Sequence, residues 1–545
     1  MVTLQQCVLA AGFAGLLSAA DAPTGNRFRA DDPLASEAAP RKVGKLEQRP
    51  INAAYDFLDQ SFETPRQPAA LTRAGDINTL GDVLDGAWYT RRHYFNRMSI
   101  DELKRGPGNS HPPQGMLVII GAKSDGVTPG FTVRDETGRE YLLKFDPPAY
   151  PELASGADVI GSKILYALGY NTPENYVLRF RPERLVIGHG AVYRTRDGHV
   201  QALTLTHIRR LLRAQPRDRD GEYRALASRW VPGEAIGAFK YWGTRSDDPN
   251  DIIDHQDRRV LRGLAVFAAW INHTDAKAIN SMDAIVEEGG HRFIRHYLID
   301  FGSSLGSDSL GPKNASRGHV YEIEPHDILR QAATLGLRAP IWQRVSTPHL
   351  VGAGRFEATS FEPRHWKSNY PNPAFLRLTE DDAFWAARQV AAFTNDDIRA
   401  MVSTAEFTDP RTTEYITQVL AARRDKIIQA YLEDRLAIDR FRVDQEKLEF
   451  DELRWHGSHN YQIAWSGYDN ESGLMQRWNG STGPQLPQLA LHLNDGSYCA
   501  ATITEPGLSG DQRVHIYLRR TSSAWTVVGI ERNMATPEVL SARSK

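Results

Sequence analysis

The sequence predicts an α+β protein, because regions of different pattern follow one another along its 545 residues. Short apolar runs broken by glycine-containing turns fill residues 116–232 and are typical of strands. Apolar residues at helical spacing dominate residues 233–445. Strand-like runs return in residues 446–545. A chain of this length is expected to form about two to four compact units.

The composition excludes several classes of protein. The chain carries 65 basic and 67 acidic residues, so no global charge attracts it to nucleic acid or to an anionic membrane. Its two cysteines, Cys7 and Cys499, are too few for a disulfide framework, and its histidines are scattered without a zinc-binding pattern. Beyond the N-terminus, no apolar run approaches the length of a membrane span. We therefore expect no nucleic-acid partner and no transmembrane span in the mature chain.

The N-terminus leaves two alternatives open. Residues 8–22, VLAAGFAGLLSAADA, have a short apolar centre and small residues before a cleavable position at Ala22, but no positive charge precedes them. Residues 1–22 are therefore either a signal peptide, which implies a periplasmic or extracellular protein, or part of a cytoplasmic one. Residues 23–115 are rich in Pro, Ala, Arg and Asp and show little periodicity, which predicts an extended N-terminal arm.

The first β-rich region opens with three strand-like runs, MLVIIG, GFTVRD and REYLLKF. Gly126 and Gly130 lie at the turn between the first two runs, and Lys144 lies near the end of the third. Apolar side chains then recur at helical spacing from residue 159 to residue 168, ahead of a glycine and a proline. We expect antiparallel strands and one prominent helix.

The helical region begins with a strongly apolar helix within residues 255–270, HQDRRVLRGLAVFAAW. A long charged helix is expected at about residues 411–440. Two further helices have starts marked by capping boxes, namely Thr379 with Asp382 and Thr394 with Asp397.

The tail contains the strand-like runs YQIAWSGY, LALHL, YCAATIT, VHIYLRR and WTVVGI. Apolar residues alternate in the fourth run, as they do in a strand with one buried face. We therefore expect residues 446–545 to form a small β-rich accessory domain, with a sandwich as one alternative.

Two polar motifs stand between the helical patterns. In HTDAKAIN (273–280), Asp275 precedes Lys277 by two residues and Asn280 by five. The motif Asp300-Phe301-Gly302 then follows the strand-like run HYLI. Together they resemble the catalytic loop H-R-D-L-K-P-x-N and the D-F-G motif of protein kinases.

The resemblance implies a two-lobed, protein-kinase-like fold over about residues 115–440, with ATP and Mg²⁺ as cofactors. It implies that Asp275 positions or deprotonates an acceptor hydroxyl and that Lys277 steadies the γ-phosphate. Asn280 and Asp300 would hold Mg²⁺, because that ion prefers oxygen ligands and retains several waters. The acceptor, a protein or a small molecule, carries no motif in this sequence.

The resemblance also implies a nucleotide-binding set in the first β-rich region. Lys144 would bind the phosphates from the third strand, and Gly126 and Gly130 would lie in the turn that covers them. The following helix should supply an acid to pair with the lysine. Asp158 is the first candidate for this acid, and Glu152 is the second.

Several features differ from ordinary protein kinases. There is no G-x-G-x-x-G, no A-P-E follows the D-F-G, and a long hairpin around EEGG separates the two motifs. These differences favour the atypical branch, which includes HipA-type kinases, phosphoinositide-kinase-like proteins and secretory-pathway kinases. The segment ALGYNTPENYV resembles the HipA type most.

Other interpretations of the same residues remain open. The polar loop could simply end a helix, since Asp and Asn favour turns. A kinase-shaped protein could bind without catalysis, or transfer AMP if ATP bound in reverse.

Residues 302–306 satisfy the G-x-S-x-G pattern of hydrolases, but a loop-like segment follows them. Residues 156–163 resemble a phosphate-binding loop, but they lie inside a helical pattern. The acidic residues between 247 and 255 could form a second metal site or charge the start of a helix.

Overall fold

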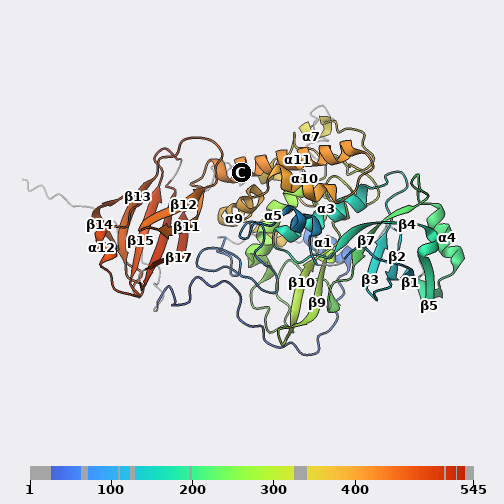
Figure 1. The fold of residues 1–545 in the computed structure, drawn as a ribbon, viewed down its shortest axis with the longest axis horizontal. Coiled ribbons are helices and arrows are strands. Elements are labelled where there is room, and N and C mark those ends of the chain that lie inside the picture. The colour runs from blue at the N-terminus through green and yellow to red at the C-terminus, as the bar shows by residue number, and fades with distance from the viewer. Residues whose placement is uncertain are drawn as a thin grey trace, which may run out of the picture.

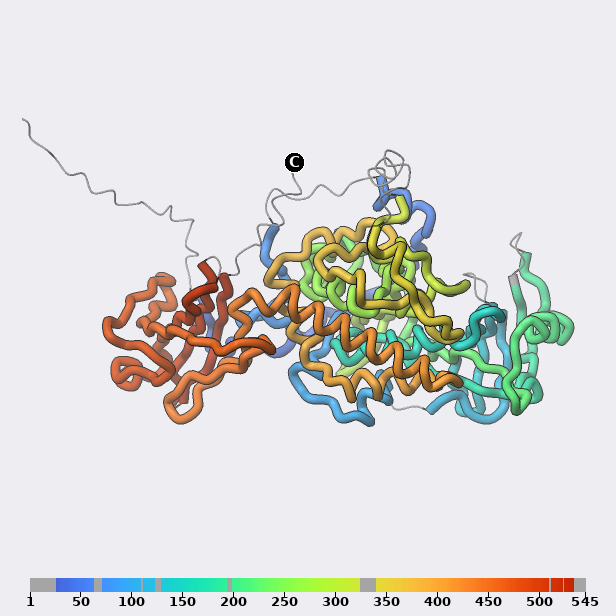
Figure 2. Tube along the Cα trace, turned by 90° about the horizontal axis from the view of Figure 1, so that it is seen from above, coloured from blue at the N-terminus to red at the C-terminus, as the bar shows by residue number. Residues whose placement is uncertain are grey.

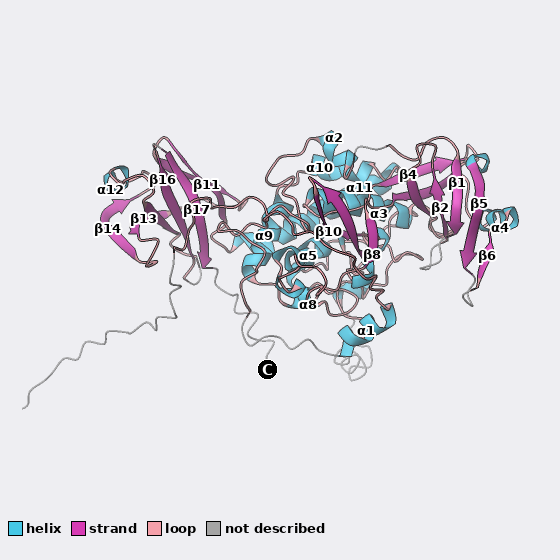
Figure 3. Ribbon diagram, turned by 90° about the horizontal axis from the view of Figure 1, so that it is seen from below, coloured by secondary structure: helices cyan, strands magenta, loops and turns pink. Residues whose placement is uncertain are grey.

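The computed structural model describes residues 26–62, 71–108, 111–122, 129–194, 199–323, 340–508, 511–522 and 524–533. The predicted α+β class is confirmed by sheets and helices throughout these ranges. The molecule is elongated, with one sheet at each end and the helices between them (Figure 1, Figure 3). The proposed signal peptide (1–22) and Gly126 lie outside the described residues.

The sheet nearest the start of the chain has seven strands in the order β4-β7-β3-β2-β1-β5-β6. The predicted antiparallel pairing of the first three strands is confirmed, but β1 and β5 run parallel, so the sheet is mixed. Its apolar face is closed by the helix α4 (Leu205–Arg213), through Ile208 and Leu212. Its strands are β1 (Leu117–Ala122), β2 (Gly130–Arg134), β3 (Glu140–Lys144), β4 (Asn175–Phe180), β5 (Leu185–Arg194), β6 (Val200–Ala202) and β7 (Tyr223–Arg229).

The predicted prominent helix of this region is α3 (Leu153–Ala167), and nearly all of its residues are buried. It ends where the sequence predicts, at Gly169, which has φ +110°. A side chain there would also collide with the ring of Tyr89, since a Cβ would lie 2.1 Å from it. The sharp turn and the close approach of the N-terminal arm therefore both require glycine.

The helices after residue 255 pack around α5 (Arg259–Ile271). Both predicted capping boxes are present, at the starts of α9 and α10. The predicted helix at 411–440 is too long, because α11 stops at Ile428 and, after a π-helical turn, β11 begins at Ile438. Ile438 is buried in the C-terminal core, and the side chain of Gln512 bonds the backbone of Leu436, so tertiary contacts end the helix. The other helices here are α7 (Ile341–Arg344), α8 (Pro373–Leu376), α9 (Glu380–Ala391), α10 (Asn395–Ser403) and α11 (Pro410–Ile428).

A three-stranded sheet joins the two polar motifs. It contains β8 (Glu234–Gly237), β9 (Ser281–Glu288) and β10 (His291–Leu298) in the order β10-β9-β8. The β9–β10 hairpin starts directly after the loop at 273–280 and ends two residues before Asp300. This hairpin brings both motifs to the same end of the sheet.

The C-terminal region contains the hairpin β11–β12 and a five-stranded antiparallel sheet in the order β14-β13-β15-β16-β17. The expected strand LALHL is wrong: Gln488–Leu491 form the short helix α12. Ala490 is buried, whereas Gln488 and Leu489 are both exposed. In a strand Gln488 would share the buried face of Ala490, so the burial pattern does not fit a strand. The strands are β11 (Ile438–Asp444), β12 (Lys447–Glu452), β13 (Gln462–Tyr468), β14 (Met475–Thr482), β15 (Tyr498–Thr504), β16 (Arg513–Thr521) and β17 (Ala524–Asn533).

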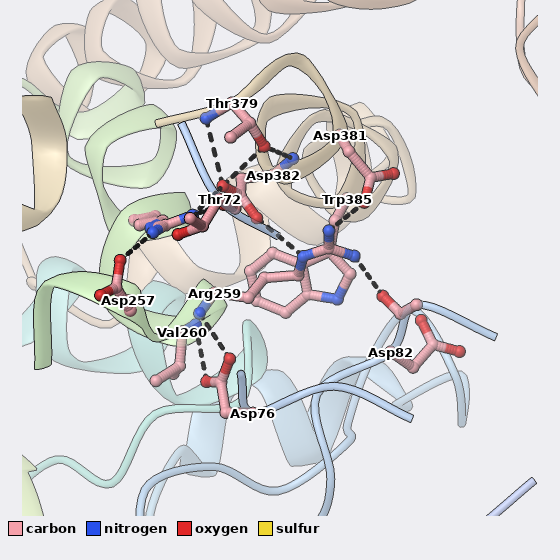
Figure 4. Close-up of polar contacts among 12 residues, drawn as sticks. Thr72, Asp76, Asp82, Asp257, Arg259, Val260, Thr379, Asp381, Asp382 and Trp385 are labelled. Atoms are coloured by element: carbon pink, nitrogen blue, oxygen red, sulfur yellow. Dashed lines mark hydrogen bonds and ion pairs between the residues drawn. The ribbon is translucent and has the colours of Figure 1, made fainter. Parts of the chain in front are cut away.

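The N-terminal arm runs along the molecule and carries the helices α1 (Ala53–Phe62) and α2 (Ile100–Arg105) (Figure 2). A buried carboxylate of the arm bonds the start of α5. Asp76 accepts hydrogen bonds from the first backbone N–H groups of α5, at Arg259 (2.6 Å) and Val260 (3.2 Å). The Arg259 side chain in turn pairs with Asp381 and Asp382 of α9 (Figure 4). Across the described residues, no helix is long and apolar enough to cross a membrane.

Candidate active site

Lys144 stands where three distant parts of the chain meet. It is the last residue of β3, and it pairs in the sheet with Gly130, the first residue of β2. Its Nζ lies 3.3 Å from Asp158 Oδ2 in α3 and 3.0 Å from Asp300 Oδ1 of the D-F-G motif. The structure therefore brings a D-F-G aspartate, 156 residues from the lysine in the sequence, to the lysine and the helix acid.

Asp158, and not Glu152, is the acid that contacts the lysine. The Glu152 carboxylate instead accepts hydrogen bonds from the backbone N–H of Thr408, at 3.1 Å. Asp158 is 2% exposed and also accepts from Asn175 Nδ2 at 2.8 Å and from the Phe301 N–H at 3.1 Å. These contacts fix the carboxylate in the position from which it orients the lysine.

The charges of this cluster depend on one another. Burial opposes the charge of Lys144, but the carboxylates of Asp300 and Asp158 together raise its pKa above the ordinary value. Burial raises the pKa of Asp158, and the charge of Lys144 opposes that shift. The lysine is consequently a charged donor held in place by two acids.

The D-F-G segment is locked against α3. Asp300 has φ 61° and ψ 68°, a left-handed conformation that is uncommon for a residue other than glycine. Phe301 is fully buried, and a Cβ at Gly161 of α3 would lie 2.8 Å from the Phe301 Cβ. The absence of a side chain at residue 161 allows this close contact, and the contact keeps Asp300 turned toward Lys144.

The predicted catalytic loop folds around Asp275. Its Oδ1 lies 2.7 Å from Lys277 Nζ, and its Oδ2 accepts from Asn280 Nδ2 at 2.8 Å. Asn280 ends the 3₁₀ turn Ala278–Asn280, and its carbonyl accepts from the Ile299 N–H at 3.0 Å. The loop is thus bonded to the residue immediately before Asp300, so the two predicted metal ligands belong to neighbouring backbone segments.

The oxygen ligands fit a Mg²⁺ ion that obtains its remaining ligands from phosphate and water. The side-chain nitrogen of Asn280, Nδ2, donates to Asp275. The side-chain oxygen of Asn280, Oδ1, is therefore the atom that could bind a cation. Asp300 supplies a carboxylate that is 45% exposed and shared with Lys144. One carboxylate and one amide oxygen suit Mg²⁺ better than an all-protein cage. Gly126 lies outside the described residues, so its relation to the phosphates stays a prediction.

The sequence interpretation missed two residues beside Asp275. Asn369 donates from Nδ2 to Asp275 Oδ1 at 3.1 Å, and its backbone N–H donates to the Thr274 carbonyl at 2.8 Å. Lys313 is 3% exposed and donates to the Thr274 hydroxyl, and burial lowers its pKa to about 8. Neither residue lies at a spacing that marks it, because both follow the motifs in long irregular segments.

His273 and Asp283 lie at the two ends of the loop and have structural contacts. Burial lowers the pKa of His273 to about 4, and its ring lies 5.7 Å from that of Phe301. Asp283 is buried in β9 and bonds His296 Nδ1 at 2.7 Å. His273 therefore packs against the D-F-G segment, and Asp283 stabilises the hairpin.

The three other sites considered from the sequence, a hydrolase serine, a phosphate-binding loop and a second metal site, lack the local structure that their chemistry requires. Ser304, the central serine of G-x-S-x-G, is fully buried and is followed by turns instead of a helix. Residues 156–163 lie within α3, without the strand and loop of a phosphate-binding motif. In the acidic segment, the Asp251 carboxylate already bonds Arg258 at 3.0 Å and His255 at 2.8 Å, so protein partners use both of its oxygens. Within the described ranges, no group of three His, Cys, Asp or Glu residues could hold a metal ion.

No protein-family model and no curated protein sequence matches this chain. Among solved structures, it has distant similarity to the proinflammatory kinase CtkA of Helicobacter pylori, at 12% identity and a TM-score of 0.31 over 58% of this chain and 95% of that one. The Golgi casein kinase with Mn/ADP bound matches at 8% identity and a TM-score of 0.26, covering 61% of this chain and 73% of that one. These values resolve no branch of the kinase-like folds and support no further conclusion.

Proposed function

We propose that this protein is an atypical kinase that transfers the γ-phosphate of ATP to a hydroxyl acceptor with the help of Mg²⁺. The observation that carries the proposal is the contact of Lys144 Nζ with both Asp158 and Asp300, 3.3 Å and 3.0 Å away. In this arrangement, the seven-stranded sheet with α3 forms one lobe, the helices form the other, and the nucleotide lies between them.

Each residue then has a role that follows from its contacts. Lys144 orients the phosphates, and Asn280 and Asp300 hold Mg²⁺, which neutralises charge on the phosphate oxygens when bound. Asp275 accepts the proton of the acceptor hydroxyl while that oxygen bonds to the γ-phosphorus. The bond from the γ-phosphorus to the bridging oxygen breaks, and ADP leaves. Lys277, which pairs with Asp275, has the proposed role of steadying the transferred phosphoryl group.

Replacing Asp300 by Ala tests the metal role. Asp300→Ala should abolish magnesium-dependent turnover of ATP, because the carboxylate is the only charged ligand in the proposed pair. Asp444→Ala, at an exposed position of β11, serves as the matched control and should keep full turnover. Full turnover in Asp300→Ala would refute the assignment.

Two alternative functions would use the same residues. Experiments with radioactively labelled ATP distinguish them from a kinase. A catalytically silent protein would bind ATP with Mg²⁺ in a thermal-shift assay but transfer no label. An AMP transferase would move label from [α-³²P]ATP, whereas a kinase moves it only from [γ-³²P]ATP. The intact set of Lys144, Asp275, Asn280 and Asp300 favours the kinase over the silent form.

Localisation forms a separate proposal. Export requires cleavage near Ala22, and the mass of the mature chain purified from its native host tests it. An intact N-terminus would favour the cytoplasmic alternative.

A further inference from the structure

A short piece of the N-terminal arm covers the second face of the C-terminal sheet. In β16, Ile516 and Leu518 contribute to the main C-terminal core, whereas Tyr517 between them belongs to a separate cluster. Successive side chains of a strand point to opposite faces, so Tyr517 lies on the face away from that core. Phe28 of the arm packs on this face and is 3% exposed.

The sheet forms a fitted pocket for the phenyl ring of Phe28. The ring centroid lies 5.1 Å from that of Tyr517, 5.9 Å from Tyr468 and 6.3 Å from Tyr498. Gly529 of β17 lies beneath it, and a Cβ at this position would be 2.4 Å from the Phe28 ring. Any larger residue at 529 would fill the space, so the pocket is shaped for a flat aromatic side chain.

Side chains of the sheet region also hold the main chain of the arm. The Phe28 N–H donates to Asn470 Oδ1 at 2.8 Å, and Asn470 Nδ2 donates to the Phe28 carbonyl at 2.8 Å. Arg519 donates to the Ala30 carbonyl at 2.7 Å. Because the Asn470 side chain bonds both the N–H and the carbonyl of Phe28, it fixes the position of the main chain independently of the side chains that the segment carries. Main-chain bonds with pockets for particular side chains are the usual basis of peptide recognition.

An acidic residue of the sheet recognises the residue before the aromatic one. Arg27 forms an ion pair with Glu531, and its guanidinium lies 4.6 Å from the Tyr517 ring centroid. Arg27 Nη1 also donates to the Tyr517 hydroxyl at 3.2 Å. Glu531 and Tyr517 are themselves bonded at 2.7 Å, so the acid is oriented by the sheet.

We propose that this face is a recognition site for a short segment of a partner protein in which an arginine precedes an aromatic residue. Residues 27–30 occupy the site in cis. The main-chain bonds, the aromatic pocket and the acid all converge on these four residues, which is the arrangement of a bound peptide. A covalently attached segment acts at an effective concentration on the order of millimolar, so a partner has to compete with the arm for the site. This site is independent of the proposed phosphotransfer.

Binding of a free peptide tests the site. The probe is a fluorescent peptide with the sequence of residues 26–32, NRFRADD. The full-length double variant Arg27→Ala/Phe28→Ala, whose own segment no longer fits, should bind the probe saturably in fluorescence polarisation. The wild-type chain should bind it at least tenfold more weakly. Adding Asn470→Ala to the double variant should weaken binding at least tenfold. A control probe with Ala at the positions of Arg27 and Phe28, the alanine probe, should not bind.

A second measurement uses the wild-type chain and does not depend on the folding of any variant. Excess probe should displace the arm and speed trypsin cleavage after Arg29, detected by mass spectrometry, whereas the alanine probe should not. Absence of both binding and accelerated cleavage would show that the arm is only a structural tie and would overturn the proposal. A wild-type dimer that the double variant converts to a monomer would assign the site to the arm of a second copy and would also overturn it.

Discussion

Asp275 is oriented by donors that come from different parts of the chain. Lys277 and Asn280 belong to its own loop, whereas Asn369 lies 94 residues further along. Lys277 and Asn280 also have proposed roles toward phosphate and metal. Asn369 is therefore the donor through which the orientation of Asp275 can be tested alone.

We predict that Asn369→Ala lowers turnover about tenfold or more, because a hydrogen bond to a charged group contributes roughly 1.5–3 kcal/mol. Nucleotide affinity should not change, since Asn369 bonds the loop, Arg317 and Glu322, and not Lys144 or Asp300. Steady-state kinetics and nucleotide titration measure the two quantities. Asn369→Asp should be at least as impaired, because it places a like charge beside Asp275. Unchanged turnover in both variants would mean that Asp275 needs no such support.

His273 should make the protein sensitive to acid. Burial lowers its folded-state pKa to about 4, below the ordinary 6.5. Below about pH 6.5 the unfolded chain binds a proton that the folded chain refuses, so stability falls as the pH drops toward 4, by on the order of 3 kcal/mol. Above pH 6.5 this contribution to the pH dependence vanishes.

Urea unfolding at pH 7 and pH 4.5 checks this prediction. The variant His273→Gln should lose less free energy of unfolding between the two pH values than the wild type does. The other histidines are common to both proteins and cancel in the comparison. Identical losses in the two proteins would contradict a neutral, buried His273.

At the scale of elements, α3 couples the seven-stranded sheet to the D-F-G segment. Gly161→Ala would insert a methyl group 2.8 Å from Phe301 Cβ. Such overpacking typically costs about 1–3 kcal/mol, and here it displaces Asp300 from Lys144. We expect turnover at saturating ATP to fall about tenfold or more.

Gly263→Ala is a matched control for this change. It is also a helical glycine with a close neighbour, since its Cβ would lie 2.6 Å from the Trp385 ring, but this contact is in the α5–α9 core. Gly263→Ala should lower the melting temperature while leaving the turnover of the folded protein unchanged. Equal effects of both variants on turnover would show that the contact with Phe301 has no special role.

Local patterns predicted some elements better than others. The capping boxes of α9 and α10 and the glycine at the end of α3 are confirmed, because these signals depend on residues close in sequence. The end of α11 and the helix α12 were predicted wrongly, because buried contacts with distant residues decide them.

At the scale of the molecule, Arg388 of α9 joins three parts of the chain. Its guanidinium pairs with Asp82 of the N-terminal arm and with Asp439 of β11, and Asp439 also bonds Arg532 of β17 at 2.7 Å. The four side chains are each 12% exposed or less. The arm, the helices and the C-terminal sheet are thus connected through one network.

We predict that Arg388→Met destabilises the protein by about 3–5 kcal/mol, because removing one partner leaves buried charge uncompensated. Calorimetry should show a lower melting temperature and a separate transition for the C-terminal region. Arg399→Ala, which removes an exposed ion pair with Glu414, should change neither. A single, unshifted transition in Arg388→Met would show that the network does not couple these parts.

The sequence by itself determined the α+β class, most of the strands near Lys144, and the spacing of Asp275, Asn280 and Asp300. Those features depend on periodicity and on fixed short intervals, which a linear chain carries. The tertiary structure alone decided between Asp158 and Glu152 as the partner of Lys144, and it alone showed that Asn369 supports Asp275 and that Phe28 lies on the C-terminal sheet. These contacts join residues from separate elements, and only the packing of the whole chain brings them together.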